Sequence, residues 1–107
     1  MKLVGTHVGD RMKLEELRAK RAEILELAEK HGAGNVRVFG SVARGEAVPG
    51  SDIDFLIDVV DSSKFRWAGG GLLVDLEALL GCEIDLATEP ELHRLIRDQV
   101  LKEAMPL

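Results

Sequence analysis

The sequence predicts an α/β (α+β) fold in which a small mixed sheet, of three strands or more, is flanked by helices. Apolar residues recur at helical spacing in three segments, and shorter segments between them carry the apolar clusters or alternation of strands. A helical segment also separates the second strand from the third. Such a connection makes these two strands parallel neighbours with a right-handed crossover.

The first part of the chain supplies one helix and one strand. Residues 12–31 are expected to form a helix, because apolar side chains recur every three or four positions until His31-Gly32 closes it. A short strand over 36–39 follows. Residues 40–51 then form a turn-rich connection that contains three glycines and a proline.

The second strand, over 52–60, shows the clearest alternation in the sequence. Its apolar residues occupy every second position, and Asp52, Asp54, Leu56 and Asp58 occupy the positions between them. Successive side chains of a strand point to opposite faces. One face of this strand is therefore apolar, and the other is mainly acidic.

After the second strand we expect a loop over 61–71, a helix over 72–80 and a strand over 83–87. A final helix is expected to begin at Glu89-Pro90. The apolar stripe expected on the final helix consists of Leu92, Leu95, Ile96, Val100 and Leu101. Residues 1–107 are expected to form one domain, with residues 1–10 as a flexible tail.

Composition narrows the class of protein. The chain has 107 residues, of which 46% are apolar and 31% charged, as in a folded domain rather than a disordered one. Its net charge of −5 argues against general nucleic-acid binding, which depends on neutralising phosphates. The single Cys82 excludes an internal disulfide and a cysteine zinc cluster. No stretch resembles a signal peptide or a membrane span, so a cytoplasmic location is expected.

The first candidate site motif is the turn after the first strand, Gly40-Ser41-Val42-Ala43-Arg44-Gly45. Glycine lets a ligand approach the backbone, and free N–H groups at the start of a helical turn favour an anion. The Ser41 hydroxyl and the Arg44 guanidinium suit phosphate. Two alternatives stay open: Gly-Ser pairs begin many ordinary turns, and Arg44 can instead pair with Glu46 or a surface carboxylate.

The second motif is Asp52-Ile53-Asp54. Its two carboxylates lie two positions apart on one strand face, where both can reach one hard cation or bridge two. Mg²⁺ prefers such oxygen ligands and completes its shell with water and substrate phosphate. The alternative is a solvated strand face.

A third carboxylate, Asp85, lies on the strand expected to neighbour Asp52 and Asp54. Its flanking apolar residues point to the opposite face, so Asp85 can join the acidic cluster. Glu83 has the same parity and is a weaker competitor for that role. The sequence therefore predicts a site of two or three carboxylates beside a glycine-serine turn.

These motifs resemble a known superfamily. Gly40-Ser41, ten further residues and then Asp52-Ile53-Asp54, followed by a later strand carboxylate, resembles the polymerase-beta-like nucleotidyltransferases. The longer string GSVARGEAVPGSDIDFLID is similar to the minimal nucleotidyltransferase branch. Members of that branch are usually encoded beside a HEPN-domain protein, often as the antitoxin of a toxin–antitoxin pair.

The resemblance implies an enzyme and a division of roles. Gly40 and Ser41 would hold the triphosphate, with Arg44 as a further phosphate contact, and Asp52, Asp54 and Asp85 would bind two Mg²⁺ ions. Asp85 would also help to deprotonate the acceptor hydroxyl. An NMP group, AMP from ATP, would pass to a tyrosine of a HEPN toxin, and pyrophosphate would leave. Two alternatives remain: an antitoxin that acts by binding alone, and transfer to a small molecule of the aminoglycoside type.

Overall fold

The computed structural model describes residues 13–48 and 50–107, and the tail expected over 1–10 lies outside them. Its longer elements are, in order, α1 (Leu14–Ala19), α2 (Arg21–Lys30), β1 (Ala33–Phe39), α3 (Gly40–Arg44), β2 (Ile53–Val59), α4 (Gly70–Leu80), β3 (Ile84–Thr88), α5 (Arg94–Glu103) and β4 (Met105–Pro106). Two short 3₁₀ turns, η2 (Trp67–Gly69) and η3 (Glu89–Glu91), precede α4 and α5. Among the described residues, no helix has the length and apolarity needed to cross a membrane.

The sheet has four strands in the order β3-β2-β1-β4. β2 and β3 are parallel, as expected of strands joined through a helix, whereas β1 runs antiparallel to both β2 and β4. The mixed sheet is thereby confirmed. The sequence analysis did not predict β4, because two residues are too few to show any alternation.

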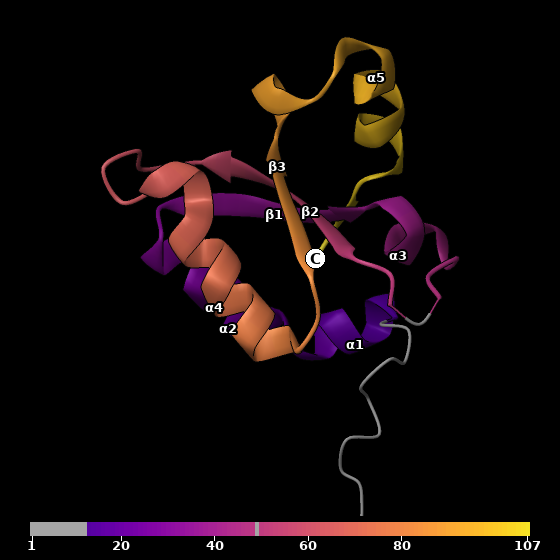
Figure 1. The fold of residues 1–107 in the computed structure, drawn as a ribbon, viewed down its shortest axis with the longest axis horizontal. Helices are drawn as coiled ribbons and strands as arrows, with labels where there is room; N and C mark the ends of the chain where they lie inside the picture. Colours follow the sequence, from indigo (N-terminus) through magenta and orange to yellow (C-terminus); the bar gives the residue numbers. More distant parts are fainter. Residues whose placement is uncertain (1–12, 49) are drawn as a thin grey trace, which may run out of the picture.

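Helices cover both faces of the sheet. α1, α2 and α4 lie on one side and α5 on the other (Figure 1). The apolar positions of β2 point into the first layer, where Ile53, Phe55 and Ile57 are almost fully buried. Leu56 points to the second face and is also fully buried. The strand face expected to be mainly acidic therefore has a buried apolar side chain, Leu56, between its aspartates.

The first helix differs from the expected one. Instead of one helix over 12–31, α1 and α2 are separated at Lys20, whose ψ of 17° lies outside helical geometry. Leu17 and Ile24 are fully buried on the two sides of the break. The apolar pattern runs through the break unchanged, so the spacing of apolar residues could not reveal it.

The last helix corrects a second expectation. Of the stripe that was expected to be apolar and buried, only Val100 is buried, and Leu95 is 84% exposed. The reason lies in the sheet face that α5 covers. Arg37 and Asp58 occupy that face beside Leu56, so it offers little apolar surface for a helix to pack on.

Candidate active site

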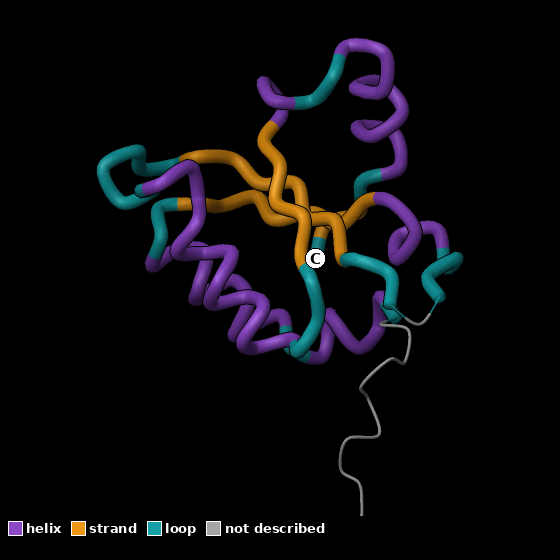
Figure 2. Tube along the Cα trace, viewed as in Figure 1, coloured by secondary structure: helices purple, strands orange, loops and turns teal. Residues whose placement is uncertain are grey.

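The glycine-serine turn joins β1 directly to α3 (Figure 2). Phe39 is still extended, and Gly40 adopts a left-handed φ of +74°, which a residue with a side chain rarely adopts. α3 then runs for five residues, and its Val42 side chain is buried in the core. The expected helical turn is therefore present. The Ser41 hydroxyl makes no hydrogen bond with the described residues.

The turn lies against the acidic strand. Phe39 is the register partner of Asp54, so the next residue, Gly40, comes alongside the Asp54 side chain. A β-carbon added at Gly40 would overlap the Asp54 carboxyl group. Glycine is thus required here on two counts, the left-handed backbone and the contact with Asp54.

Two of the three expected carboxylates, Asp54 and Asp85, come together, and Asp52 lies near enough for its charge to act on Asp54. Asp54 and Asp85 are register partners on the parallel strands β2 and β3, and Asp52 precedes Asp54 by two positions. Burial raises the pKa of Asp54 to about 6, and the hydrogen bond and charge of Asp85, then the charge of Asp52, add to the increase. The Arg44 charge opposes it. Asp54 therefore keeps its proton to a higher pH than an ordinary carboxyl group, and a bound cation would relieve the same repulsion once it ionises.

The donor set suits a hard cation. Carboxylate oxygens are the ligands that Mg²⁺ prefers, and a cation would relieve the repulsion that raises the pKa of Asp54. Within residues 13–48 and 50–107, however, there is no group of three or more Asp, Glu, His or Cys side chains placed so that it could hold a metal ion. Water and nucleotide phosphates would have to supply the other ligands.

Arg44 has the partner that the sequence left open, and a second one. Its Nε donates to Glu46 Oε1 at 2.7 Å, and its Nη1 donates to both carboxylate oxygens of Glu103, at 3.2 and 3.1 Å. The Gly40 N–H also donates to Glu103, with an N–O distance of 2.6 Å. Glu103 is the site residue that the sequence analysis missed, because only the pairing of β4 brings it there.

Asp58 lies outside this cluster. Although it shares a strand face with Asp54, its carboxylate accepts hydrogen bonds from Arg37 Nη2 at 2.8 Å and Asn35 Nδ2 at 2.9 Å. Arg37 also pairs with Glu89, at 3.4 Å. These bonds hold Asp58 in place and leave it a structural role.

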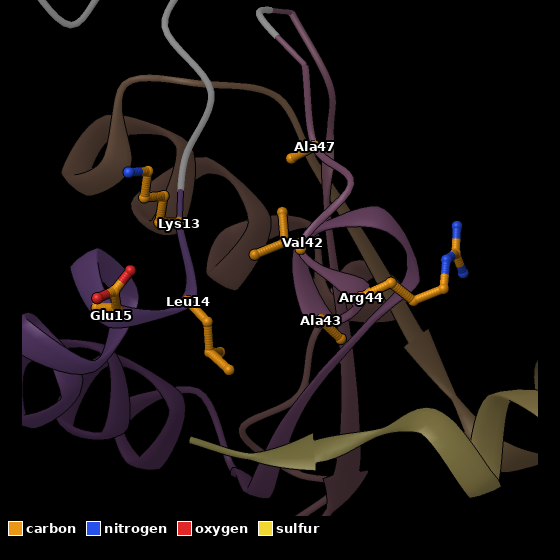
Figure 3. Close-up of a pocket in the computed structure, with 8 residues that line it drawn as sticks. Lys13, Leu14, Glu15, Val42, Ala43, Arg44 and Ala47 are labelled. Carbon is orange, nitrogen blue, oxygen red and sulfur yellow. The ribbon is translucent and has the colours of Figure 1, made fainter.

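A groove of about 420 Å³ lies between α1 and α3. It is lined by Lys13, Leu14, Glu15, Val42, Ala43, Arg44, Gly45 and Ala47 (Figure 3). None of the three aspartates lines it, and the Arg44 side chain points away from the other labelled residues. The groove is therefore distinct from the carboxylate cluster.

Comparison with known proteins gives concordant matches. The model of the nucleotidyltransferase domain family matches residues 17–106. Protein adenylyltransferase MntA of Thermococcus cleftensis is 40% identical over 81 residues, which cover 75% of this chain and 80% of that protein. A protein of Methanocaldococcus jannaschii, provisionally named a protein adenylyltransferase, is 32% identical over 100 residues, covering 88% of this chain and 97% of its own.

Solved structures agree with these matches. One that is described provisionally as a minimal nucleotidyltransferase has a TM-score of 0.72 and 45% identity, and the match covers 90% of this chain and 97% of the other. A crystal structure of a toxin–antitoxin with AMP-PNP has a TM-score of 0.60 at 23% identity, covering 79% of this chain and 69% of that one. At that identity the likeness concerns the fold alone.

Proposed function

Because this chain belongs to the nucleotidyltransferase domain family and to its minimal branch, we propose that it transfers AMP from ATP to a hydroxyl group of a partner protein. The observation that carries this proposal is the contact of the Gly40–Ser41 turn with Asp54, whose carboxyl group is in turn paired with that of Asp85. A phosphate-holding turn and a cation-attracting cluster are the two parts that nucleotidyl transfer needs.

The proposed roles are those that the resemblance to nucleotidyltransferases implies, and the positions of the residues support them. Gly40 leaves room for phosphate, and the Ser41 hydroxyl, which has no hydrogen-bond partner within residues 13–48 and 50–107, can donate to it. Asp52, Asp54 and Asp85 would hold two Mg²⁺ ions, which when bound neutralise the charge on the attacking and leaving oxygens. Asp85 is exposed, so it can accept the proton of an incoming hydroxyl.

The reaction is a single displacement at the α-phosphorus. The acceptor oxygen forms a bond to the α-phosphorus, the bond to the bridging oxygen breaks, and pyrophosphate leaves with the electron pair. The acceptor's proton passes to Asp85. The residues that orient the hydroxyl and the phosphates contribute as well, because holding reactants in line supplies much of the rate increase.

We further propose that the acceptor is a tyrosine of a HEPN-domain toxin and that the transfer makes this chain its antitoxin. The relative from T. cleftensis is named a protein adenylyltransferase, and a neighbour in fold is a toxin–antitoxin crystallised with AMP-PNP. The net charge of −5 does not favour nucleic acid as the acceptor.

The test is transfer to the protein encoded beside this chain. The purified pair is incubated with Mg²⁺ and labelled ATP, and mass spectrometry locates any added AMP. We expect AMP on tyrosine with the wild type and none with Asp52→Ala. A partner that binds tightly yet stays unmodified with all four nucleotides would make this chain an antitoxin that acts by contact. Labelling of an aminoglycoside instead would support the small-molecule reading.

A further inference from the structure

We propose that Glu103, the last residue of α5, is a positioning residue of the nucleotide site. Its carboxylate fixes the Gly40 peptide and the Arg44 guanidinium in the arrangement that the nucleotide phosphates require. The inference rests on the proposed function, because it concerns how that site is held. Glu103 lies outside both motifs that the sequence indicates.

Strand pairing places Glu103 beside the turn. β4 is antiparallel to β1, with Val38 opposite Met105 and Arg37 opposite Pro106. Continuing this register by two residues brings Glu103 opposite Gly40. The segment is anchored further along, where Leu107 is buried and its N–H donates to the Val36 carbonyl at 3.1 Å. The position of Glu103 is thus set by the sheet.

The bonds of Glu103 are strong ones. The Gly40 N–H reaches Oε2 at 2.6 Å, and Arg44 Nη1 lies 3.2 and 3.1 Å from the two carboxylate oxygens. Hydrogen bonds in which the donor or the acceptor is ionised are about twice as strong as neutral ones. The Glu103 side chain is only 17% exposed, so water competes for these bonds less than it does at the surface.

These bonds act on the site from behind the turn. Glu103 holds the N–H of Gly40, while the Cα side of the same residue faces the Asp54 carboxyl group. Arg44 is held at Nε by Glu46 and at Nη1 by Glu103. Its Nη2 makes no hydrogen bond with the described residues and remains as a donor for an anion. A turn and a guanidinium fixed in advance lose less entropy when the nucleotide binds.

Calorimetry on the full chain with Mg²⁺ and AMP-PNP tests the inference. Glu103→Ala should raise the Kd for the nucleotide by about tenfold or more. Glu103→Gln keeps an acceptor for the Gly40 N–H but loses the ion pair, so it should lie between the wild type and Glu103→Ala. Asp98→Ala removes an exposed acidic residue of the same helix and should leave the Kd unchanged. Arg44→Ala added to Glu103→Ala should cost less than the two single effects combined, because both act through one contact.

Hydrogen exchange supplies a readout that needs no nucleotide. The Gly40 amide should exchange faster in both Glu103 variants and at the wild-type rate in Asp98→Ala.

Wild-type affinity in a folded Glu103→Ala would overturn the inference. Tighter binding would also overturn it, because Glu103 would then be a competitor of phosphate. If Glu103→Ala does not fold, Glu103→Gln decides by the same criteria. A wild type that binds no nucleotide would overturn the proposed function as well, whereas a failure confined to the variants concerns Glu103 alone.

Discussion

Two left-handed glycines flank α3, and they separate backbone strain from contact with the site. Gly40 and Gly45 have φ values of +74° and +73°, but only a β-carbon at Gly40 would meet another residue, the Asp54 side chain. Alanine at either position should lower the free energy of unfolding by about 1–2 kcal/mol through the left-handed backbone.

The same pair of variants should differ in activity. Gly40→Ala displaces the Asp54 carboxyl group, and a displacement of about 1 Å at a reacting centre can cost about 100-fold in rate. Gly45→Ala should retain turnover within a few-fold. Urea unfolding and AMP transfer, measured on both variants, check the prediction. Equal activities would show that contact with Asp54 is not what requires glycine.

The raised pKa of Asp54 predicts how stability depends on pH without metal. In the folded chain this group holds its proton up to about pH 6, whereas its ordinary pKa is 3.8. Its contribution to stability is therefore fully present below pH 3.8 and is lost as the pH rises through 6. The neighbouring carboxyl group of Asp85 contributes to this increase in pKa through its hydrogen bond and its charge.

Asp54→Asn should remove this pH dependence. In EDTA at pH 7.5 the variant should be as stable as the wild type or more stable, by about 1 kcal/mol after allowance for solvent screening, yet it should transfer no AMP. Urea unfolding at pH 5 and pH 7.5 measures the effect. Asp58→Asn is the control, and it should lose stability because it breaks the pairing with Arg37. A loss of several kcal/mol in Asp54→Asn would reveal a structural role instead.

At the level of single residues, the sequence located most of the candidate site. Strand parity and the parallel connection were enough to predict that Asp85 comes beside Asp54, and the structure has them in register. Parity could not reveal Glu103, whose position depends on the register of a two-residue strand. The position of Asp58 two pleats along the strand separates it from the cluster, but parity could not reveal its bonds from Arg37 and Asn35, which lie on another strand. The chemical roles of the site residues remain predictions.

Among the elements, α5 is the helix whose burial the apolar spacing predicted wrongly, and two variants test its packing. Val100 is 6% exposed and Leu95 is 84% exposed, although both belong to the stripe that spacing predicts. Val100→Ala should cost about 1–2 kcal/mol, at about 0.8 kcal/mol for each buried methylene-sized group. Leu95→Ala should cost less than about 0.5 kcal/mol, as surface changes do. Thermal or urea unfolding decides, and similar losses would mean that Leu95 is buried.

The elements were predicted as far as local patterns determine them. The alternation of β2 and the glycine at the end of α4 gave their types and approximate bounds. The break at Lys20 leaves the spacing of apolar residues unchanged, and the pairing of β4 depends on a distant strand, so local periodicity reveals neither. α5 has a helical pattern, but its burial depends on what the sheet presents to it.

For the molecule as a whole, metal and nucleotide should stabilise the fold together. Mg²⁺ alone has too few preformed ligands among the described residues, and phosphates would add the missing ones. A ligand that binds only the folded chain at 100 times its Kd adds about 2.7 kcal/mol. Mg²⁺ with AMP-PNP should therefore raise the Tm clearly, and Mg²⁺ alone only slightly. No joint effect at millimolar concentrations would argue against the metal site.

The partner is expected to dock near residues 65–71. Trp67 there is 85% exposed and has a φ of +54°, which is unusual for a bulky residue. Exposed tryptophans often carry much of the affinity of an interface. Trp67→Ala should weaken the complex by about 30-fold, equivalent to about 2 kcal/mol, without lowering the Tm. Leu95→Ala, equally exposed on the other side of the sheet, is the control in a titration calorimetry experiment. Unchanged affinity in Trp67→Ala would place the interface elsewhere.

The bond between Gly40 and Glu103 joins residues 63 positions apart, and this separation has a consequence for the newly made chain. The turn and the three aspartates all leave the ribosome before Glu103 does. A growing chain can therefore carry every motif residue while the turn still lacks the bond that fixes it. If Glu103 positions the turn as proposed, such a chain would bind nucleotide less tightly until the segment after α5 has paired with β1.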